Sequence, residues 1–375
     1  MKSARPLIHP LGGARLGDLI GIINKHGISR QHIIDGLLMF AASAAQTPLA
    51  LVETSQVAGR LAQVEFVPAP IFIVGHWRSG TTYLHNLMSQ DPNFAFPTML
   101  ETLRPSKFLP GPLDFISRRL ILRSLSRTRP MDNVPLTIDL PQEDEIALAA
   151  LGAPSFFNCL YFPQDLKQAF AANVLFEGLP PDEVRNWERK IRYYLAKLSL
   201  RKGGRQLLIK NPAHSARIGR LTKLFPGCRF IHLHRHPYDV FASTLKFYQR
   251  MIPVVGLQAW NPSSLNDHVL WAYQRLMTVL IESLDRLPAD RYLEISYNDL
   301  VDSPVTTIEH IYGSFGLKGV NCVRGRISSM VGVGSPSEPI GNAPDPATMA
   351  ALGSFCTRLG YRPAPILNRA MRLKP

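Results

Sequence analysis

The chain has 375 residues, of which 46% are hydrophobic, so it can bury one large core with a smaller appendage and is not expected to be extensively disordered. Lysine and arginine exceed aspartate and glutamate by 42 to 28, and the resulting net charge of +14 favours polyanions, anionic lipid surfaces or highly phosphorylated small molecules as partners. Charge alone does not choose among these classes.

Residues 1–66 predict an N-terminal helical extension. Apolar side chains recur every three or four positions over residues 16–62, which is typical of two or three amphipathic helices, and Pro48 is expected to end the second one. The most apolar part, residues 37–52, is interrupted by polar residues and falls short of the roughly 20 residues that a membrane-spanning helix needs. We therefore expect no transmembrane segment, while peripheral contact with a membrane stays open.

The four cysteines lie far apart in the sequence, and none forms a Cys-x-x-Cys pair. The N-terminus also lacks the charged segment and apolar segment of a secretory signal. Together these features predict a cytoplasmic protein.

Residues 71–82, with the sequence IFIVGHWRSGTT, predict a strand, a phosphate-sized loop and the start of a helix. The spacing Gly-x4-Gly-Thr-Thr is that of the P-loop, whose backbone N–H groups surround an anion. A nucleotide triphosphatase needs lysine where this chain has Thr81, and the cation lies three residues upstream at Arg78. The loop therefore predicts an anion site that is not built for Mg-ATP.

Acidic residues follow the loop in two places. Glu101 is a carboxylate among apolar neighbours, and Glu143, Asp144 and Glu145 stand at the start of a predicted helix, where the helix dipole favours negative charge. A long helix is expected over residues 181–200.

Strands alternate with helices in the second half, which predicts a parallel sheet with right-handed crossovers. Strands are expected at residues 206–210, 229–234 and 291–296, and helices at 215–225, from 237, 267–287, 304–315 and 346–359, with a loop over 318–347. We expect an α/β fold of the P-loop-like three-layer α/β/α type over residues 67–375, with helical insertions.

Ligands of open α/β sheets bind at the carboxyl ends of the strands, and cations follow three of the predicted strands: Arg78, Lys210 and Arg235. The three downstream strands do not end on the aspartate with which a kinase or GTPase holds magnesium. The sequence therefore predicts a pocket that neutralises its anion with arginine and lysine, without a metal.

Two segments give a specific resemblance. Residues 71–94 resemble the 5′-phosphosulfate loop of the sulfotransferases that use 3′-phosphoadenosine 5′-phosphosulfate (PAPS). Residues 229–245 resemble their 3′-phosphate element, since Ser243 follows Arg235 by eight positions. Residues 210–214 are similar to the Lys-x-Pro-x-His pattern of the bacterial and carbohydrate-type branch, and the likeness extends over about residues 68–316.

The resemblance implies that the 5′-phosphosulfate is held by four consecutive residues, Ser79, Gly80, Thr81 and Thr82. It also implies that Arg235 and Ser243 bind the 3′-phosphate. Arg78 would offer a planar fork to the phosphosulfate oxygens and stabilise charge on the leaving phosphate, and Lys210 would assist near the leaving oxygen. Arg324 and Arg326 are poor substitutes for the Arg-Lys-Gly motif with which the cytosolic branch completes this site.

Sulfuryl transfer also needs a base that takes the proton of the acceptor. Glu101 approximately matches the glutamate that follows the loop helix in the carbohydrate and tyrosylprotein branches, His214 matches the histidine of the Lys-x-Pro-x-His pattern, and Glu143 is a third candidate. The sequence leaves this choice open.

We expect in-line transfer of a sulfo group from PAPS to a hydroxyl or amine of a carbohydrate, lipid or small-molecule acceptor. Aromatic residues in segments 95–200 and 318–347 favour a partly hydrophobic acceptor, although they would serve equally well as core. The alternatives are a P-loop kinase with a degenerate loop and a non-catalytic basic module. A nucleic-acid partner is not expected, because basic and aromatic residues do not interleave.

Overall fold

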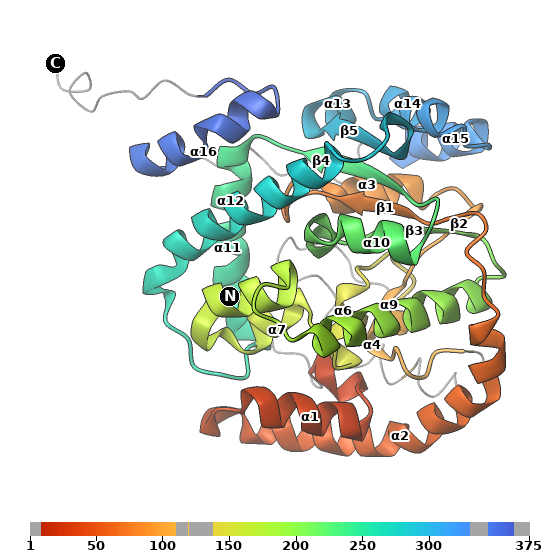
Figure 1. The fold of residues 1–375 in the computed structure, drawn as a ribbon, viewed down its shortest axis with the longest axis vertical. Helices are drawn as coiled ribbons and strands as arrows, with labels where there is room; N and C mark the ends of the chain where they lie inside the picture. The colour runs from red at the N-terminus through yellow and green to blue at the C-terminus, as the bar shows by residue number, and fades with distance from the viewer. Residues whose placement is uncertain (1–8, 110–118, 120–137, 331–343, 364–375) are drawn as a thin grey trace.

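The computed structural model describes residues 9–109, 119, 138–330 and 344–363, which form an α/β fold around a five-stranded sheet (Figure 1). All neighbouring strands are parallel, in the order β2-β3-β1-β4-β5. The strands are β1 (Ile71–Val74), β2 (Phe94–Ala95), β3 (Gln206–Lys210), β4 (Arg229–His234) and β5 (Tyr292–Ser296). The predicted fold class and four of the strands are confirmed, and the two-residue edge strand β2 was not predicted.

Helices cover both faces of the sheet, as expected for a three-layer arrangement (Figure 1). The helices are α1 (Leu16–His26), α2 (Ile33–Ala62), α3 (Thr81–Met88), α4 (Met99–Leu103), α6 (Glu145–Ala150), α7 (Phe156–Tyr161), α8 (Leu166–Phe170), α9 (Pro181–Arg201), α10 (Ile218–Leu224), α11 (Pro237–Val255), α12 (Leu265–Leu284), α13 (Tyr297–Asp302), α14 (Pro304–Phe315), α15 (Val320–Met330) and α16 (Pro346–Arg358). Four of them begin on proline, whose fixed φ suits the first helical position: α9, α11, α14 and α16.

The buried strand β1 separates two parts of the core. Ile71 and Ile73 pack in a cluster with side chains of α3, α14 and α15, whereas Phe72 and Val74 belong to the larger cluster with α9, α10 and α12. Successive side chains of a strand point to opposite faces, so an unbroken apolar run is what a strand covered on both sides requires.

The N-terminal helices α1 and α2 lie side by side along the lower edge of the view in Figure 1. The prediction that Pro48 ends a helix is wrong, because α2 continues through it. Proline removes one backbone hydrogen bond at a cost of about 3 kcal/mol, but the turn before it is held by tertiary contacts. Ser43 Oγ donates to the Ala14 carbonyl at 2.6 Å, and Thr47 Oγ1 accepts from the Leu16 N–H at 2.9 Å.

Because α2 continues through Pro48, its 30 residues exceed the roughly 20 that a membrane-spanning helix needs. Within the described residues, one helix, residues 30–62, is long and apolar enough to cross a membrane by length and composition alone. One face of this helix packs against the protein through Met39, Ala50 and Val57.

The prediction of a loop over residues 318–347 is also wrong in part. Residues 320–330 form α15, whose side chains Val323 and Ile327 lie four positions apart and are fully buried against the cluster that contains β1. Residues 331–343 of the predicted loop lie outside the described part of the chain, as do residues 110–118 and 120–137 of the predicted acceptor segment.

Candidate active site

The loop between β1 and α3 requires both of its glycines. Gly75 and Gly80 have φ angles of 137° and 98°, which favour glycine. A Cβ at Gly75 would come within 2.3 Å of the Leu233 carbonyl oxygen, and one at Gly80 within 2.3 Å of the Tyr297 ring. This loop leads into α3 at Thr81, and the first N–H groups of a helix have no intrahelical acceptor and carry the positive end of its dipole. The loop is therefore shaped to hold an anion.

Arg78 connects this loop with α11. Its Nε donates a hydrogen bond of 2.9 Å to Ser243 Oγ, across 165 positions of sequence. Arg78 also has a positive φ of 71°, a strained conformation that recurs at functional sites. The residues that the sequence assigned to two separate phosphate sites thus contact each other.

Arg235 lies at the same edge of the sheet, directly after β4. It is 6% exposed, and its Nε donates to Asp239 Oδ2 at 3.2 Å. Its guanidinium lies over the Tyr297 ring, 4.7 Å from the centroid, and the same ring closes over Gly80. Arg78, Gly80, Arg235 and Ser243 are therefore brought together by the fold.

Lys210 is the last residue of β3 and points toward the start of α3. Its Nζ lies 3.3 Å from Thr82 Oγ1 and 2.5 Å from Glu143 Oε1. The Lys210 side chain is 5% exposed and that of Glu143 is 19% exposed. Glu143 is therefore connected through Lys210 to the first turn of α3, and it is partly exposed to solvent.

The two acids after Glu143 have a different environment. Glu145 pairs with Arg217 through two hydrogen bonds of 3.0 and 3.1 Å, and both side chains are fully buried. Asp144 Oδ2 lies 2.9 Å from His214 Nε2, and Asn211 donates to both Asp144 and Glu145. This buried network fixes the segment that carries Glu143 to the turn that follows Lys210.

Sequence reasoning did not find this network. It interpreted the three consecutive acids as charge at a helix N-terminus, although α6 begins only at Glu145. The available signal was that residues 210–217 contain three basic residues, Lys210, His214 and Arg217, because three adjacent carboxylates that become buried need partners.

We expect Glu145→Ala to lower the free energy of unfolding by about 3–5 kcal/mol, because it leaves the Arg217 charge buried without its carboxylate. Urea denaturation measures the loss. The matched control is Glu188→Ala, which removes an exposed pair with Arg220 and should cost about 0–1 kcal/mol. Equal losses in the two variants would contradict the structural role of Glu145.

Glu101 lies away from the loop contacts. Its Oε2 accepts from the Thr98 N–H and hydroxyl at 2.8 and 2.9 Å, and its Oε1 pairs with Arg201 and Lys202 at 2.7 and 2.9 Å. The side chain is 1% exposed. Among the contacts of the described residues, none joins Glu101 to Arg78, to Lys210 or to the loop. His214, which is fully buried against Asp144, does not contact the loop either.

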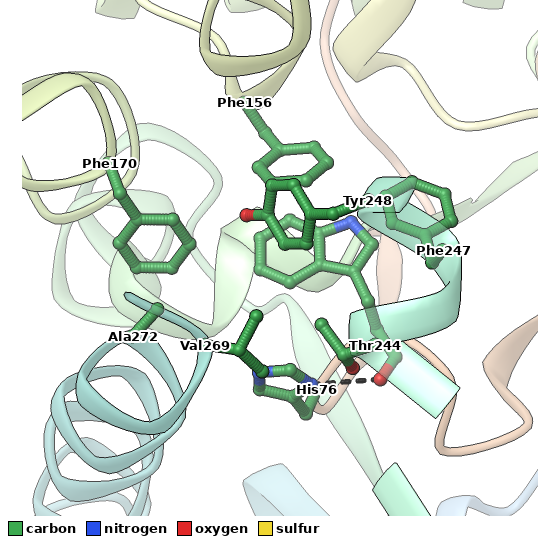
Figure 2. A pocket seen from close by; sticks show the side chains of 9 residues that line it. His76, Phe156, Phe170, Thr244, Phe247, Tyr248, Val269 and Ala272 are labelled. Carbon is green, nitrogen blue, oxygen red and sulfur yellow. Dashed lines mark hydrogen bonds between the residues drawn. The ribbon is translucent and has the colours of Figure 1, made fainter. Parts of the chain in front are cut away.

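An aromatic pocket adjoins the loop on the side of α11 and α12 (Figure 2). His76 is buried, and burial lowers its pKa to about 4, so the ring is neutral at pH 7. The ring of Trp77 stacks at 4.1 Å from that of Phe156. The pocket is lined by His76, Trp77, Phe156, Phe170, Thr244, Phe247, Tyr248, Val269 and Ala272. All of these side chains are buried, so the pocket is closed to solvent, and His76 and Trp77 anchor the anion loop in the core.

Among the described residues, no group of three or more His, Cys, Asp or Glu side chains is arranged to hold a metal ion. His232 and His234 instead face Glu294 and Tyr361, at 2.9 and 3.0 Å. The cations Arg324 and Arg326 lie against Glu309 and the Gln90 carbonyl.

Comparison with known proteins identifies the family of this chain. Residues 70–320 match the sulfotransferase family, so the chain belongs to that family and is a sulfotransferase, which confirms the resemblance seen in the sequence. The chain is 33% identical over 268 residues to the omega-hydroxy-beta-dihydromenaquinone-9 sulfotransferase Stf3 of Mycobacterium tuberculosis, and equally to that of Mycobacterium bovis. That match covers 72% of this chain and 68% of the relative.

Two solved structures share the fold. Sulfotransferase STF9 from Mycobacterium avium aligns with a TM-score of 0.71 at 16% identity, covering 93% of this chain and 97% of that one. Sulfotransferase STF1 from Mycobacterium tuberculosis H37Rv aligns with a TM-score of 0.63 at 18% identity, covering 91% of each chain.

Proposed function

We propose that this sulfotransferase takes its sulfo group from PAPS and transfers it to the hydroxyl group of an apolar lipid. The observation that carries the choice of donor is the hydrogen bond between Arg78 and Ser243. It joins the loop expected to hold a 5′-phosphosulfate to the helix expected to hold a 3′-phosphate, so one nucleotide with both groups would occupy both.

The residues present suit such a donor. The N-terminus of α3 and the buried cations Lys210 and Arg235 offer positive potential at one edge of the sheet. PAPS supplies a sulfo group activated by its bond to a phosphate. Arg78 stabilises the negative charge that develops on that phosphate, and Arg235 with Ser243 distinguishes a nucleotide with a 3′-phosphate from one without it.

For the base, we propose Glu143. The Glu143 carboxylate contacts Lys210, and Lys210 in turn contacts Thr82 at the start of α3. Among the described residues, the contacts of Glu101 and His214 do not include Lys210 or Thr82. Glu143 is also the most exposed of the three, at 19% against 1% for Glu101 and 0% for His214. A base must reach the acceptor directly or through one water, and the partners of Glu101 and His214 hold them inside the protein.

The lipid acceptor is supported by the comparison with a relative. The relative Stf3 is named for the sulfation of a hydroxylated dihydromenaquinone, which is an apolar lipid.

The cytoplasm remains the compartment that we propose, since a reducing environment suits four cysteines that are all free.

The proposal is tested by incubating the enzyme with labelled PAPS and matched acceptors in a buffer that contains EDTA. A hydroxylated prenyl quinone should become labelled, whereas the same quinone without its hydroxyl should not. A water-soluble monosaccharide is the acceptor for the alternative class. Labelling of the monosaccharide without labelling of the hydroxylated quinone would contradict the lipid acceptor.

A further inference from the structure

The described residues expose eight large hydrophobic side chains, and seven of them lie on α1 and α2. We call these seven the apolar face: Ile20, Ile33, Ile34, Leu37, Leu38, Leu51 and Val52. Their exposed fractions range from 42% to 73%. Both helices form the outer edge of the molecule in Figure 1, opposite the edge that carries α13, α14 and α15. Soluble monomers seldom leave so many aliphatic side chains together in water.

Charge is absent from the middle of this face and present at its ends. No charged residue occurs between Gly36 and Val52, a stretch of about 25 Å in a helix. Two acids lie directly at its ends, where Asp35 pairs with His32 and the buried Glu53 pairs with Lys197. Exposed Arg30 and Arg60 lie beyond these acids, and exposed Lys25 at the end of α1 adds a third cation beside its partner Glu183. An apolar centre between cations matches a membrane with anionic head groups.

The inner face of α2 decides how the helix can sit in such a membrane. Met39, Ala50 and Val57 are buried against the protein. Glu53 pairs with the fully buried Lys197 at 2.5 Å. A helix that crossed the bilayer would leave the Lys197 charge buried without its carboxylate, which costs several kcal/mol. The helix can therefore lie in the membrane plane while it stays attached to the protein.

The helix that carries most of the apolar face is connected to the candidate site through two packed segments. Helix α6 begins directly after Glu143 and Asp144 and packs against residues 10–13, which in turn pack against α2. Since α6 has six residues, it spans about 9 Å. Helix α6 and residues 10–13 thus connect the segment of the proposed base with α2.

We propose that the apolar face of α1 and α2 inserts into the head-group region of an anionic membrane and holds the enzyme at the surface where its acceptor resides. The choice of a membrane over another partner rests on the lipid acceptor proposed above. The net charge of +14 acts in the same direction, because it attracts the protein to an anionic surface before the apolar side chains insert.

The test is flotation of the full chain with vesicles of phosphatidylcholine alone or mixed with phosphatidylglycerol. The wild-type protein should float with the anionic vesicles, and less so at high salt. Leu37→Glu combined with Leu38→Glu should weaken vesicle binding at least about tenfold, because two exposed leucines no longer insert. The matched control is Val67→Glu, since Val67 is 77% exposed but lies outside both helices, and it should float like the wild type.

Folding and function are followed separately. Thermal unfolding and binding of 3′-phosphoadenosine 5′-phosphate should be the same in the double variant and the wild type, because both leucines are exposed. Sulfation of a lipid acceptor in detergent should persist in the double variant, whereas sulfation of the same lipid in vesicles should fall. Vesicle binding without any lipid sulfation would contradict the proposed lipid acceptor but would still support membrane binding by the apolar face.

Two outcomes would overturn the proposal that the apolar face binds a membrane. One is vesicle binding by the double variant at the wild-type level. The other is a wild-type dimer that does not bind vesicles and that the double variant converts to a monomer, since the apolar face would then be covered by a second copy of the chain. Light scattering coupled to size-exclusion chromatography measures this oligomeric state.

Discussion

Replacing Arg78 with alanine is expected to reduce kcat/KM for sulfuryl transfer by about 10²- to 10³-fold, the usual effect of removing one charge-stabilising donor from a transition state. Arg78 Nε contacts Ser243, so the substitution also removes the connection between the loop and α11. Binding of 3′-phosphoadenosine 5′-phosphate should weaken in the same variant. Steady-state kinetics and calorimetric titration measure the two effects.

Two further variants make the Arg78 result specific. Arg78→Lys keeps the charge but loses the planar fork, so its activity should lie between those of the alanine variant and the wild type. Arg189→Ala removes an exposed arginine whose contact is with Asn186 on the same helix, and it should leave turnover unchanged. An Arg78→Ala enzyme with normal turnover would overturn the assignment of the loop.

Glu143→Gln is expected to lower kcat by about 10²- to 10⁴-fold, the range that a positioned general base contributes. Glutamine can still accept a hydrogen bond from Lys210 but cannot take up a proton, so donor binding should change little. Loss of turnover with intact donor binding is a result that a merely structural role of Glu143 would not give. Single-turnover kinetics and calorimetric titration with 3′-phosphoadenosine 5′-phosphate measure the two effects.

Glu101→Gln serves as the comparison for Glu143→Gln. It weakens the pairs with Arg201 and Lys202, so the melting temperature should fall while the folded enzyme keeps its turnover. If Glu101→Gln instead loses turnover with its stability and donor binding intact, and Glu143→Gln does not, Glu101 is the base and our choice between them is wrong.

The sequence predicts the parts of this protein that local patterns determine. The unbroken apolar run of β1 and the alternation of strands and helices after residue 200 are sufficient for a parallel sheet, and four of the five observed strands agree with the prediction within one residue. The loop spacing and the cations after β1, β3 and β4 indicate an anion site because the carboxyl ends of parallel strands meet at one edge.

Long-range contacts explain what the sequence could not predict. The cost of Pro48 is local, whereas the contacts of Ser43 and Thr47 that outweigh it involve residues near the N-terminus. The same holds for the three candidate bases. The residues next to Glu101 in the sequence do not show that its carboxylate pairs with Arg201 and Lys202. Those next to Glu143 do not show that its carboxylate pairs with Lys210.

The most direct test of the account is a calorimetric titration of the protein with three nucleotides, in EDTA and then in magnesium. We expect 3′-phosphoadenosine 5′-phosphate to bind equally well with and without magnesium. We expect 5′-AMP, which lacks the 3′-phosphate, to bind at least about tenfold more weakly, because Arg235 and Ser243 then have no anion to bind. Magnesium-dependent binding of ATP that equals or exceeds binding of the bisphosphate would contradict the account.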